Sequence, residues 1–388
     1  MKQAIKKGAG VKAASFSIKD FKQNNLKTAP VADKEMEWYI MPKGFTDATG
    51  LPGIPKGFFS GTCGWNSTGK STMKNCLIAS AQKQGDLVVI FETESNFDFN
   101  YAKNCGMEVE PIYGDVEEVD EETGEVVVKK GIIDYDGNFI LFTNEAICDY
   151  CGDIDYDTNT RKSTKRRIAV IEDIAYIMND FLDKQESGEL PVNILFIWDS
   201  VGSVISWKTY KSKVGGLAMN EAAAISQRFN SIVNTRIPSS RSQNYPYTNT
   251  FFIVGKLWDS SMQTMGKPSV KMKGGTSFEY ALRLWFFQGR TITSGVKKLE
   301  ATVKGEKYTY GTTAPIETKK NHLPEPFTVT REGTLYCTGH GILAEDEIDQ
   351  YKKKILPTII QKLKDGDKTG KLGDITEDDI EFIEEDAN

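Results

Sequence analysis

The sequence predicts an α/β fold organised around a doubly wound, mostly parallel β-sheet. Short continuous apolar runs are typical of parallel strands covered on both faces, and they occur at residues 86–91, 194–198, 251–254 and 282–287. Segments with the apolar spacing of helices lie between these runs, including residues 72–83 and 168–182. Ligands of such sheets bind at the carboxyl ends of the strands, so we expect the functional residues there.

The composition is that of a globular protein with one large domain. The chain has 388 residues, of which 39% are hydrophobic and 26% charged, which is enough for a full core with small appendages. No apolar run approaches the roughly 20 residues of a membrane span, and the lysine-rich beginning lacks the apolar segment of a secretory signal. We therefore expect a cytoplasmic protein.

Charge is distributed unevenly along the chain. Lys and Arg number 48 against 54 Asp and Glu, and the net charge of −6 does not by itself indicate nucleic-acid binding. The beginning is basic, whereas Glu377 to Asp386 is strongly acidic. We expect a basic N-terminal arm that could serve oligomerisation, a core with a small acidic insertion, a small helical segment and a disordered acidic tail. These units are predicted at residues 1–40, 41–335 (insertion about 108–167), 336–373 and 374–388.

A phosphate-binding loop is predicted directly after the first core strand. Residues 64–71 read G-x-x-x-x-G-K-S, follow the apolar stretch 57–60 and precede a helical run. Glycines in this pattern let backbone N–H groups converge on phosphate oxygens at the start of a helix. We expect ATP, with Lys70 at the β- and γ-phosphates and Ser71 on Mg²⁺. The predicted nucleotide contacts are Gly64, Trp65, Asn66, Ser67, Thr68, Gly69, Lys70, Ser71 and Thr72.

Acidic residues follow two of the predicted strands. Asp199 comes directly after the run 194–198, and an acid at this place is suited to hold Mg²⁺ through water. Glu92 and Glu94 lie at the end of the strand that follows the phosphate-loop helix in the sequence. Either carboxylate could polarise the water that attacks the γ-phosphate. We favour Glu94, together with Lys70, as the catalytic pair. The competing interpretation is that both glutamates are solvated charges at a strand end.

Six cysteines are spread over the chain, and two of them have C-x-x-C spacing. Cys148 and Cys151 form this pair within the expected insertion, but no second pair lies near enough to complete a zinc site. In a chain of this length the cysteines are read as thiols rather than as a disulfide framework. Ordinary thiols are favoured for this pair, with zinc or redox chemistry as the alternative.

The order of these motifs resembles the RecA recombinases. The phosphate loop is followed by F-E-T-E-S at residues 91–95 and by W-D-S at residues 198–200, and the phage UvsX branch is the most similar in character. The resemblance covers roughly residues 45–335. It implies a RecA-like ATPase core, and it assigns the catalytic base to Glu94. The acidic tail is favoured as a disordered solubilising segment, and the resemblance offers the alternative of an autoinhibitory mimic of DNA phosphates.

The resemblance further implies two loops that hold single-stranded DNA. The first is residues 206–213, where lysines alternate with aromatic residues, a pattern suited to backbone neutralisation and base stacking. The second is residues 258–275. Composition alone leaves open that both are solvated surface loops. The expected DNA-binding cations are Lys208, Lys211, Lys213, Lys267, Lys271 and Lys273.

Two segments depart from the family's pattern. In RecA a pair of lysines reaches across the subunit interface to the neighbour's ATP, and the matching positions here are Lys320 and His322, so the second cation is only partly charged at neutral pH. Gly255-Lys256 stands where the family often has an asparagine-glutamine pair that senses the γ-phosphate. Lys256 could contact phosphate directly or face solvent as a strand-end cation.

Taken with the resemblance, the motifs predict a DNA-dependent ATPase that assembles on single-stranded DNA and carries out homologous pairing and strand exchange. The expected cofactors are ATP and Mg²⁺. The expected partners are single-stranded DNA, homologous duplex DNA and a mediator or single-strand-binding protein. We expect further copies of the chain to assemble as a filament rather than a ring. If the chain is phage-encoded, its location is the cytoplasm of a bacterial host. Two alternatives remain: a hexameric helicase of the same fold and a nucleotide-gated single-strand binding or annealing protein.

Overall fold

A computed structural model describes residues 33–119, 126–212, 218–259, 270–272, 276–290, 294–367, 372 and 374–386. Most of the basic arm expected at residues 1–40 lies outside these described residues. The arm's expected role in oligomerisation therefore stays a prediction.

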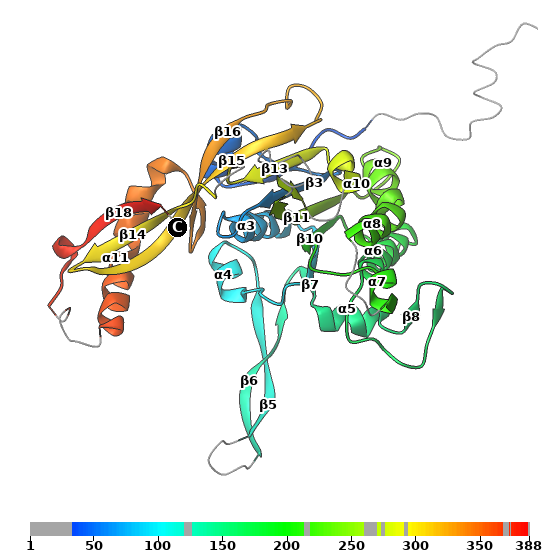
Figure 1. The fold of residues 1–388 in the computed structure, drawn as a ribbon, viewed down its shortest axis with the longest axis horizontal. Coiled ribbons are helices and arrows are strands. Elements are labelled where there is room, and N and C mark those ends of the chain that lie inside the picture. The colour runs from blue at the N-terminus through cyan, green and yellow to red at the C-terminus, as the bar shows by residue number, and fades with distance from the viewer. Residues whose placement is uncertain are drawn as a thin grey trace, which may run out of the picture.

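The predicted α/β fold is confirmed: six parallel strands form the centre of a large mixed sheet (Figure 1). Their order across the sheet differs from their order in the chain, as expected for a doubly wound sheet. The four apolar runs of the sequence fall in β4, β10, β11 and β13. Across the sheet the strands are β13 (Leu284–Gln288), β3 (Phe59–Gly64), β11 (Asn249–Asp259), β10 (Ile194–Val201), β4 (Leu87–Glu92) and β7 (Phe139–Phe142).

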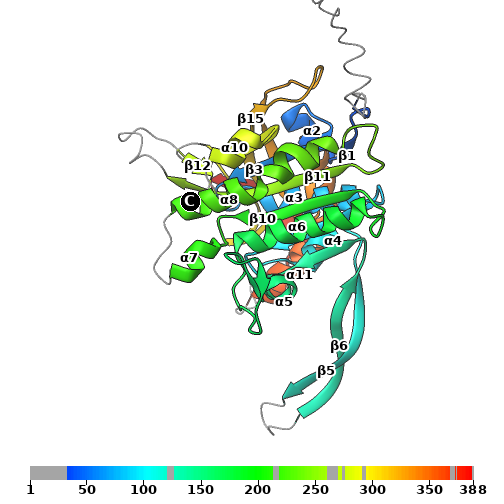
Figure 2. The same ribbon diagram turned by 90° about the vertical axis from the view of Figure 1, so that its right-hand side faces the viewer.

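Helices cover both faces of the parallel strands, because alternate residues of each strand are buried on opposite sides. In β10, Phe196 and Trp198 belong to one hydrophobic core, whereas Leu195 and Ile197 belong to the other. Figure 2 shows α6 and α8 in front of the sheet and α3 behind it. The first core is closed by α5 (Asn144–Cys151), α6 (Ile171–Glu186), α8 (Ala218–Ser231) and α10 (Thr276–Ala281). The second is closed by α2 (Lys43–Thr49), α3 (Lys70–Gln82) and α4 (Phe99–Asn104).

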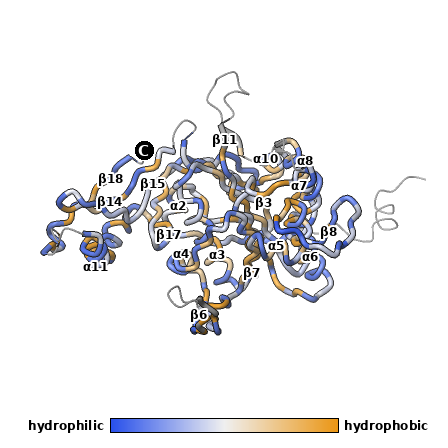
Figure 3. Tube along the Cα trace, turned by 60° about the horizontal axis from the view of Figure 1, so that its bottom comes forward, coloured by the Kyte–Doolittle hydropathy of each residue, from blue (hydrophilic) through white to orange (hydrophobic). Residues whose placement is uncertain are grey.

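An antiparallel extension continues the sheet beyond β13 and ends in a C-terminal lobe. The long strand β15 (Glu306–Asn321) pairs with β13 at one end and with β14 (Lys297–Val303) at the other. We use the name C-terminal lobe for β14, the outer half of β15, α11 (Ile348–Gly366) and β18 (Glu381–Asp386), which share a third core. Along α11, which is mainly hydrophilic in Figure 3, the buried positions recur at helical spacing: Tyr351, Ile355, Ile359 and Leu363.

The end of the chain differs from the sequence prediction. Its acidic composition predicts disorder, but residues 381–386 form β18, which pairs with β14 over Lys297 to Thr302. The physical reason is the open edge of β14, whose backbone groups need partners, together with Phe382, whose ring packs 5.5 Å from that of Tyr310. The expected boundary near residue 335 likewise falls inside β16 (Glu332–Thr338), which pairs with β15 and with β17 (Gly341–Leu343).

The expected insertion at residues 108–167 contains a long hairpin that projects from the body (Figure 1). Its strands are β5 (Glu110–Val119) and β6 (Val126–Asp136), and a second, short pair is formed by β8 (Ile154–Asp155) and β9 (Thr160–Arg161). The apolar piece at residues 139–142 is not part of this insertion, because as β7 it pairs in parallel with β4.

The remaining elements connect or flank the sheet. They are β1 (Trp38–Ile40), β2 (Gly53–Pro55), α7 (Trp207–Ser212), the π-helical turn Ile232–Arg236, α9 (Ile237–Ser239), β12 (Val270–Met272) and the 3₁₀ turns Glu345–Glu347 and Glu377–Asp379.

Candidate ATP-binding and catalytic site

The phosphate loop connects β3 to α3, and its two glycines are required by its shape. A Cβ at Gly64 would lie 2.5 Å from the backbone oxygen of Gln288 on the adjacent strand. Gly69 has a φ of 88°, and a Cβ there would collide with Cys337 Sγ. Ser67 also has a positive φ, of 61°. Because left-handed conformations are costly for residues with a Cβ, this turn depends on the glycine spacing of the motif.

Lys70 begins α3 and lies inside the loop. Its Nζ donates to the carbonyl of Gly64 at 3.0 Å and to that of Trp65, and Thr68 Oγ1 also donates to the Trp65 carbonyl at 2.8 Å. Burial lowers the pKa of Lys70, and the carboxylate of Asp199 opposes that effect. The loop therefore presents the N-terminus of a helix and a lysine at one point, an arrangement suited to a chain of phosphates.

The predicted acids meet at the carboxyl ends of neighbouring strands. β4 and β10 are adjacent and parallel, and Glu92 lies opposite Asp199 in their register. The next residue, Thr93, donates its backbone N–H to the Asp199 carbonyl at 2.8 Å, which fixes the two strand ends together. β4, which follows α3 in the chain, and β10 thus bring Glu92 and Asp199 to the edge of the sheet where α3 begins.

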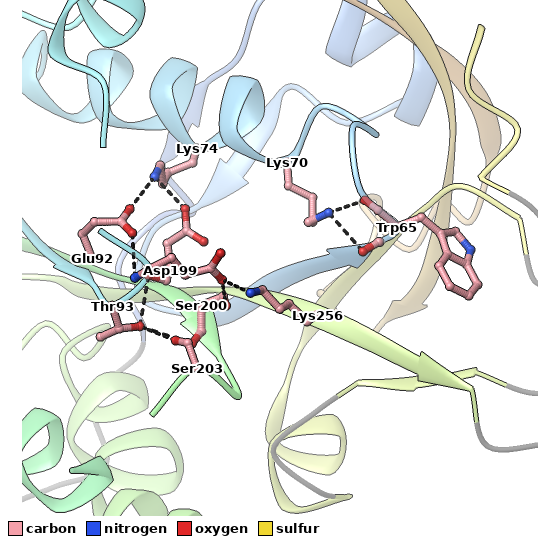
Figure 4. Close-up of polar contacts among 11 residues, drawn as sticks. Trp65, Lys70, Lys74, Glu92, Thr93, Asp199, Ser200, Ser203 and Lys256 are labelled. Atoms are coloured by element: carbon pink, nitrogen blue, oxygen red, sulfur yellow. Dashed lines mark hydrogen bonds and ion pairs between the residues drawn. The ribbon is translucent and has the colours of Figure 1, made fainter. Parts of the chain in front are cut away.

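Sequence reasoning missed a buried lysine between these acids. Lys74, one turn beyond Lys70 on α3, has a side chain that is only 3% exposed, and its Nζ lies 2.6 Å from Asp199 Oδ2 and 3.2 Å from Glu92 Oε2 (Figure 4). The one available signal was a second lysine four residues after Lys70, on the same side of the helix.

The electrostatics of this cluster are dominated by burial and mutual pairing. Burial lowers the pKa of Lys74, but the carboxylates of Asp199 and Glu92 more than compensate, so that the pKa is raised overall. Burial raises the pKa of Glu92, and the ammonium of Lys74 opposes this. Lys74 therefore stays protonated and holds both carboxyl groups.

Glu94 is engaged by a hydroxyl and a lysine. Ser200 Oγ donates to Glu94 Oε1, and Lys256 Nζ forms an ion pair with the same oxygen at 3.0 Å. Lys256 lies on β11 opposite Gly64 of the phosphate loop, and its side chain is 43% exposed. The sequence left two roles open for Lys256, a contact with phosphate and a solvent-facing cation. The structure adds a third role, because Lys256 pairs with the predicted base.

The residues expected at Mg²⁺ fit that ion chemically. Ser71 is exposed in the first turn of α3, and Asp199 directs only Oδ2 at Lys74, while Oδ1 accepts no hydrogen bond from the described residues. Within the described ranges, no group of three or more His, Cys, Asp or Glu side chains could hold a metal ion. Mg²⁺ commonly takes one or two protein ligands and completes its shell with water and phosphate oxygens, which suits a serine and a single carboxylate.

A cavity of about 640 Å³ opens beside the loop, between the parallel core and the C-terminal lobe. Its wall combines loop residues with side chains that sequence reasoning did not assign to the site. Tyr101 contributes a hydroxyl 2.5 Å from Thr72 Oγ1, and His340 Nδ1 lies 3.0 Å from the Tyr351 hydroxyl. Aromatic and hydroxyl groups next to a phosphate site are suited to a nucleoside.

Lys320 and His322 lie at the opposite edge of the sheet. Lys320 is opposite Trp285 at the start of β13, and its Nζ donates to the carbonyls of Glu279 and Tyr280, each at 2.8 Å. His322 is exposed and follows directly after β15. The phosphate loop begins at the other end of β3, so these two residues are not brought together with the nucleotide site of their own chain. Their expected contact with a neighbouring subunit stays a prediction.

The first expected DNA loop is largely helical, and Trp207, one of its two aromatic residues, is packed inside the protein. Trp207 is buried, its ring lies 5.5 Å from that of Tyr210, and the guanidinium of Arg166 lies 5.2 Å from the Trp207 ring. Lys208 is exposed on α7, whereas Lys211 forms an ion pair with Asp157. Lys213, Lys267 and Lys273 lie outside the described residues, and for Lys271, in β12, only the backbone is described.

The C-x-x-C pair is packed inside the protein on α5. Cys148 and Cys151 are both buried, and burial raises the pKa of the Cys148 thiol to about 11 and that of Cys151 further. Raised pKa values disfavour the thiolate that metal binding and thiol exchange require. The favoured interpretation as ordinary thiols agrees with this packing.

Comparison with known proteins gives one family. Residues 34–137 match the RecA N-terminal domain. The segment shared with Protein RecA of Aquifex aeolicus is 32% identical over 126 residues, or 32% of this chain and 34% of the relative. Protein RecA of Aquifex pyrophilus is 38% identical over 90 residues, or 22% of this chain and 26% of the relative. These matches support a RecA-family protein.

The similarity to RecA is partial, and its limits matter for the site. The chain spans about a quarter to a third of the length of the RecA relatives that it matches. The matched residues 34–137 include the phosphate loop, Lys74 and Glu94, but Asp199 and Lys256 lie beyond them. In the structure these outer residues nevertheless join the RecA-like segment at one sheet edge. No helix of the described residues is long and apolar enough to cross a membrane.

Proposed function

We propose that this chain is a RecA-like, DNA-dependent ATPase that assembles on single-stranded DNA, pairs it with a homologous duplex and drives strand exchange. The observation that carries the proposal is the meeting of the phosphate loop, Asp199 and Glu94 at one edge of the sheet. The similarity of residues 34–137 to RecA supports the recombination role. The closer likeness to phage UvsX proteins, and a bacterial host's cytoplasm as the location, are part of the same proposal.

Within this function each residue has a defined task. Lys70 and the backbone N–H groups at the start of α3 bind and neutralise the phosphates, and Ser71 and Asp199 hold the metal ion. Mg²⁺, when bound with ATP, supplies positive charge at the phosphate oxygens. Glu94 orients the attacking water, for which its carboxylate must be released from Lys256 and Ser200. Aromatic residues of the cavity, Tyr101 among them, accommodate the nucleoside.

We further propose that assembly completes this site. Lys320 and His322 lie at the sheet edge opposite their own phosphate loop, where they can serve a neighbouring copy in a filament. Lys208 and the lysines of the two expected loops contact the DNA backbone, and a mediator or single-strand-binding protein assists loading. A nucleotide-gated single-strand binding or annealing protein is the second candidate, because the Lys256–Glu94 pair engages the predicted base.

The test measures ATP hydrolysis and strand exchange with and without single-stranded DNA. We expect DNA to stimulate hydrolysis and Lys70→Ala to abolish nucleotide binding and strand exchange, whereas Lys83→Ala, at an exposed position directly after the same helix, leaves both intact. Negative-stain imaging with single-stranded DNA and a non-hydrolysable ATP analogue should show filaments. Strand exchange by the Lys70→Ala variant would overturn the assignment, and DNA binding without turnover would favour the annealing protein.

A further inference from the structure

Lys74 is a buried cation that the proposed ATPase mechanism does not use. It lies on the inner face of α3, and the carboxylates that it contacts come from β4 and β10, so three separate elements meet at its ammonium group. Glu92 is 1% exposed and Asp199 9% exposed at their side chains. The ring of Phe97 closes another side, 5.0 Å from Lys74 Nζ. Such a cluster is expensive to desolvate, so a gain in stability does not by itself explain it.

The charges of the cluster decide what else it can bind. Glu92 and Asp199 lie opposite each other on adjacent strands, and without Lys74 they would form a site with two negative charges, which attracts a free divalent cation. With Lys74 present, two carboxylates and one ammonium leave a net charge of −1. Asp199 Oδ2 is occupied by Lys74, and Oδ1 is the oxygen that accepts no hydrogen bond from the described residues.

We propose that Lys74 is a positioning residue that makes metal binding at Asp199 depend on the triphosphate. This inference rests on the proposed function, because it takes Asp199 as the residue that holds the metal. Lys74 supplies the counter-charge that a free ion would otherwise provide, and it orients Asp199 so that one oxygen remains for a metal that arrives with phosphate ligands. The protein alone therefore binds Mg²⁺ poorly, and the pair of carboxylates is kept from filling with an ion before the nucleotide binds.

The experiment uses Mg²⁺ alone as the probe, with thermal unfolding of the full chain as the readout. Lys74→Met removes the charge at nearly constant volume and leaves two carboxylates facing each other. We expect about 10 mM Mg²⁺ to raise the midpoint of this variant by about 2 °C or more, and that of the unaltered protein by less than about 0.5 °C. The double variant Lys74→Met/Asp199→Asn should lose the response.

A matched control is available in a second buried lysine. Lys56 pairs with buried Asp86 at 2.8 Å, and Asp86 precedes β4 at the edge of the sheet away from the phosphate loop. Lys56→Met should be destabilised without a response to Mg²⁺. An equal response of the unaltered protein and Lys74→Met, or an equal response of the two lysine variants, would overturn the proposal.

A second variant keeps the inference testable if Lys74→Met does not fold. Glu92→Gln leaves Lys74 paired with Asp199 alone and raises the net charge of the cluster to zero. We expect its Mg²⁺-dependent gain in ATP affinity to fall by about fivefold, with the Mg²⁺-free affinity unchanged. A loss of both affinities in parallel would mean a merely structural role. Failure of the unaltered protein to bind ATP even with Mg²⁺ would instead refute the proposed function, and the metal-only measurement distinguishes these cases.

Discussion

Lys256 Nζ lies 3.0 Å from Glu94 Oε1, so that β11 and the segment after β4 are joined by an ion pair directly beside the phosphate loop. The lysine side chain is 43% exposed and that of the glutamate 18%. An ion pair with this exposure stabilises by at most about 1 kcal/mol. Its importance therefore lies in the orientation of Glu94 rather than in the stability of the fold.

The first prediction concerns release of Glu94. Lys256→Gln should raise ATP hydrolysis in the absence of DNA by up to about fivefold, because the carboxylate no longer has to leave an ion pair worth up to about 1 kcal/mol. Steady-state phosphate release without DNA measures the effect. Lys83→Gln, at an exposed lysine directly after α3, is the control and should leave the rate unchanged. A lower basal rate in Lys256→Gln would show instead that Lys256 assists the reaction.

The second prediction tests the shape of the phosphate loop. Gly69→Ala should lower the free energy of unfolding by about 2–5 kcal/mol, since the left-handed φ of 88° costs about 1–2 kcal/mol and the new Cβ must also displace Cys337. Gly85→Ala is a matched control: its φ is 77°, but nothing lies within 4 Å of the new Cβ, so only the conformational cost remains. Urea denaturation compares the two.

Nucleotide binding should be lost in Gly69→Ala and kept in Gly85→Ala. Addition of Cys337→Ala to Gly69→Ala should recover the part of the stability that the collision removes. Equal losses in the two single variants would show that Cys337 does not constrain the loop.

The phosphate loop and the strand-end acids could be predicted because their chemistry is encoded locally. Eight consecutive residues specify the loop, and an acid after an apolar run identifies a strand end. Lys74 was missed because its partners lie far away in the chain, 18 and 125 residues further on, and only the adjacency of β4 and β10 brings them together. Sequence patterns report periodicity well, but they do not report which strands become neighbours.

Two other expectations, the aromatic residues of the first DNA loop and the disordered acidic tail, came from local composition. Trp207 and Tyr210 have the composition of a base-stacking loop, but Trp207 is buried, with Arg166 and Tyr156 packed against its ring. The acidic end of the chain has the composition of a disordered tail, but the free edge of β14 gives its backbone a partner. In both cases tertiary contacts override the local signal, and neither contact is visible in a short window of sequence.

The third prediction concerns this terminal strand. Phe382→Ala should lower the free energy of unfolding of the C-terminal lobe by about 1–2 kcal/mol, because a half-buried aromatic ring leaves its contacts with Tyr310 and Lys352. Hydrogen exchange of α11 measures the effect, and faster exchange is expected there and not in α3. Glu381→Ala, at an exposed position of the same strand, is the control. Unchanged exchange in Phe382→Ala would indicate that β18 does not stabilise the lobe.

The fourth prediction is a pH dependence that follows from a buried carboxyl group. Glu172, in the first turn of α6, is 7% exposed, and its Oε2 accepts the backbone N–H of Trp207 at 2.8 Å. Burial raises the pKa of Glu172, and the hydrogen bond from Trp207 opposes this. Because the folded pKa lies above the unfolded one, the contribution of this group to stability is fully present below the unfolded pKa and is lost as the pH rises through the folded pKa.

Glu172→Gln removes this titration while an amide oxygen can still accept the bond from Trp207. The variant should therefore gain in stability relative to the unaltered protein as the pH is raised from about 4 to about 8. Urea denaturation at several pH values measures the difference, with Glu189→Gln, at an exposed position beyond α6, as the control that should show no such trend. A difference that is constant with pH would mean that the carboxyl group of Glu172 titrates in the folded protein as it does in the unfolded chain, and that its burial between α6 and α7 carries no electrostatic cost.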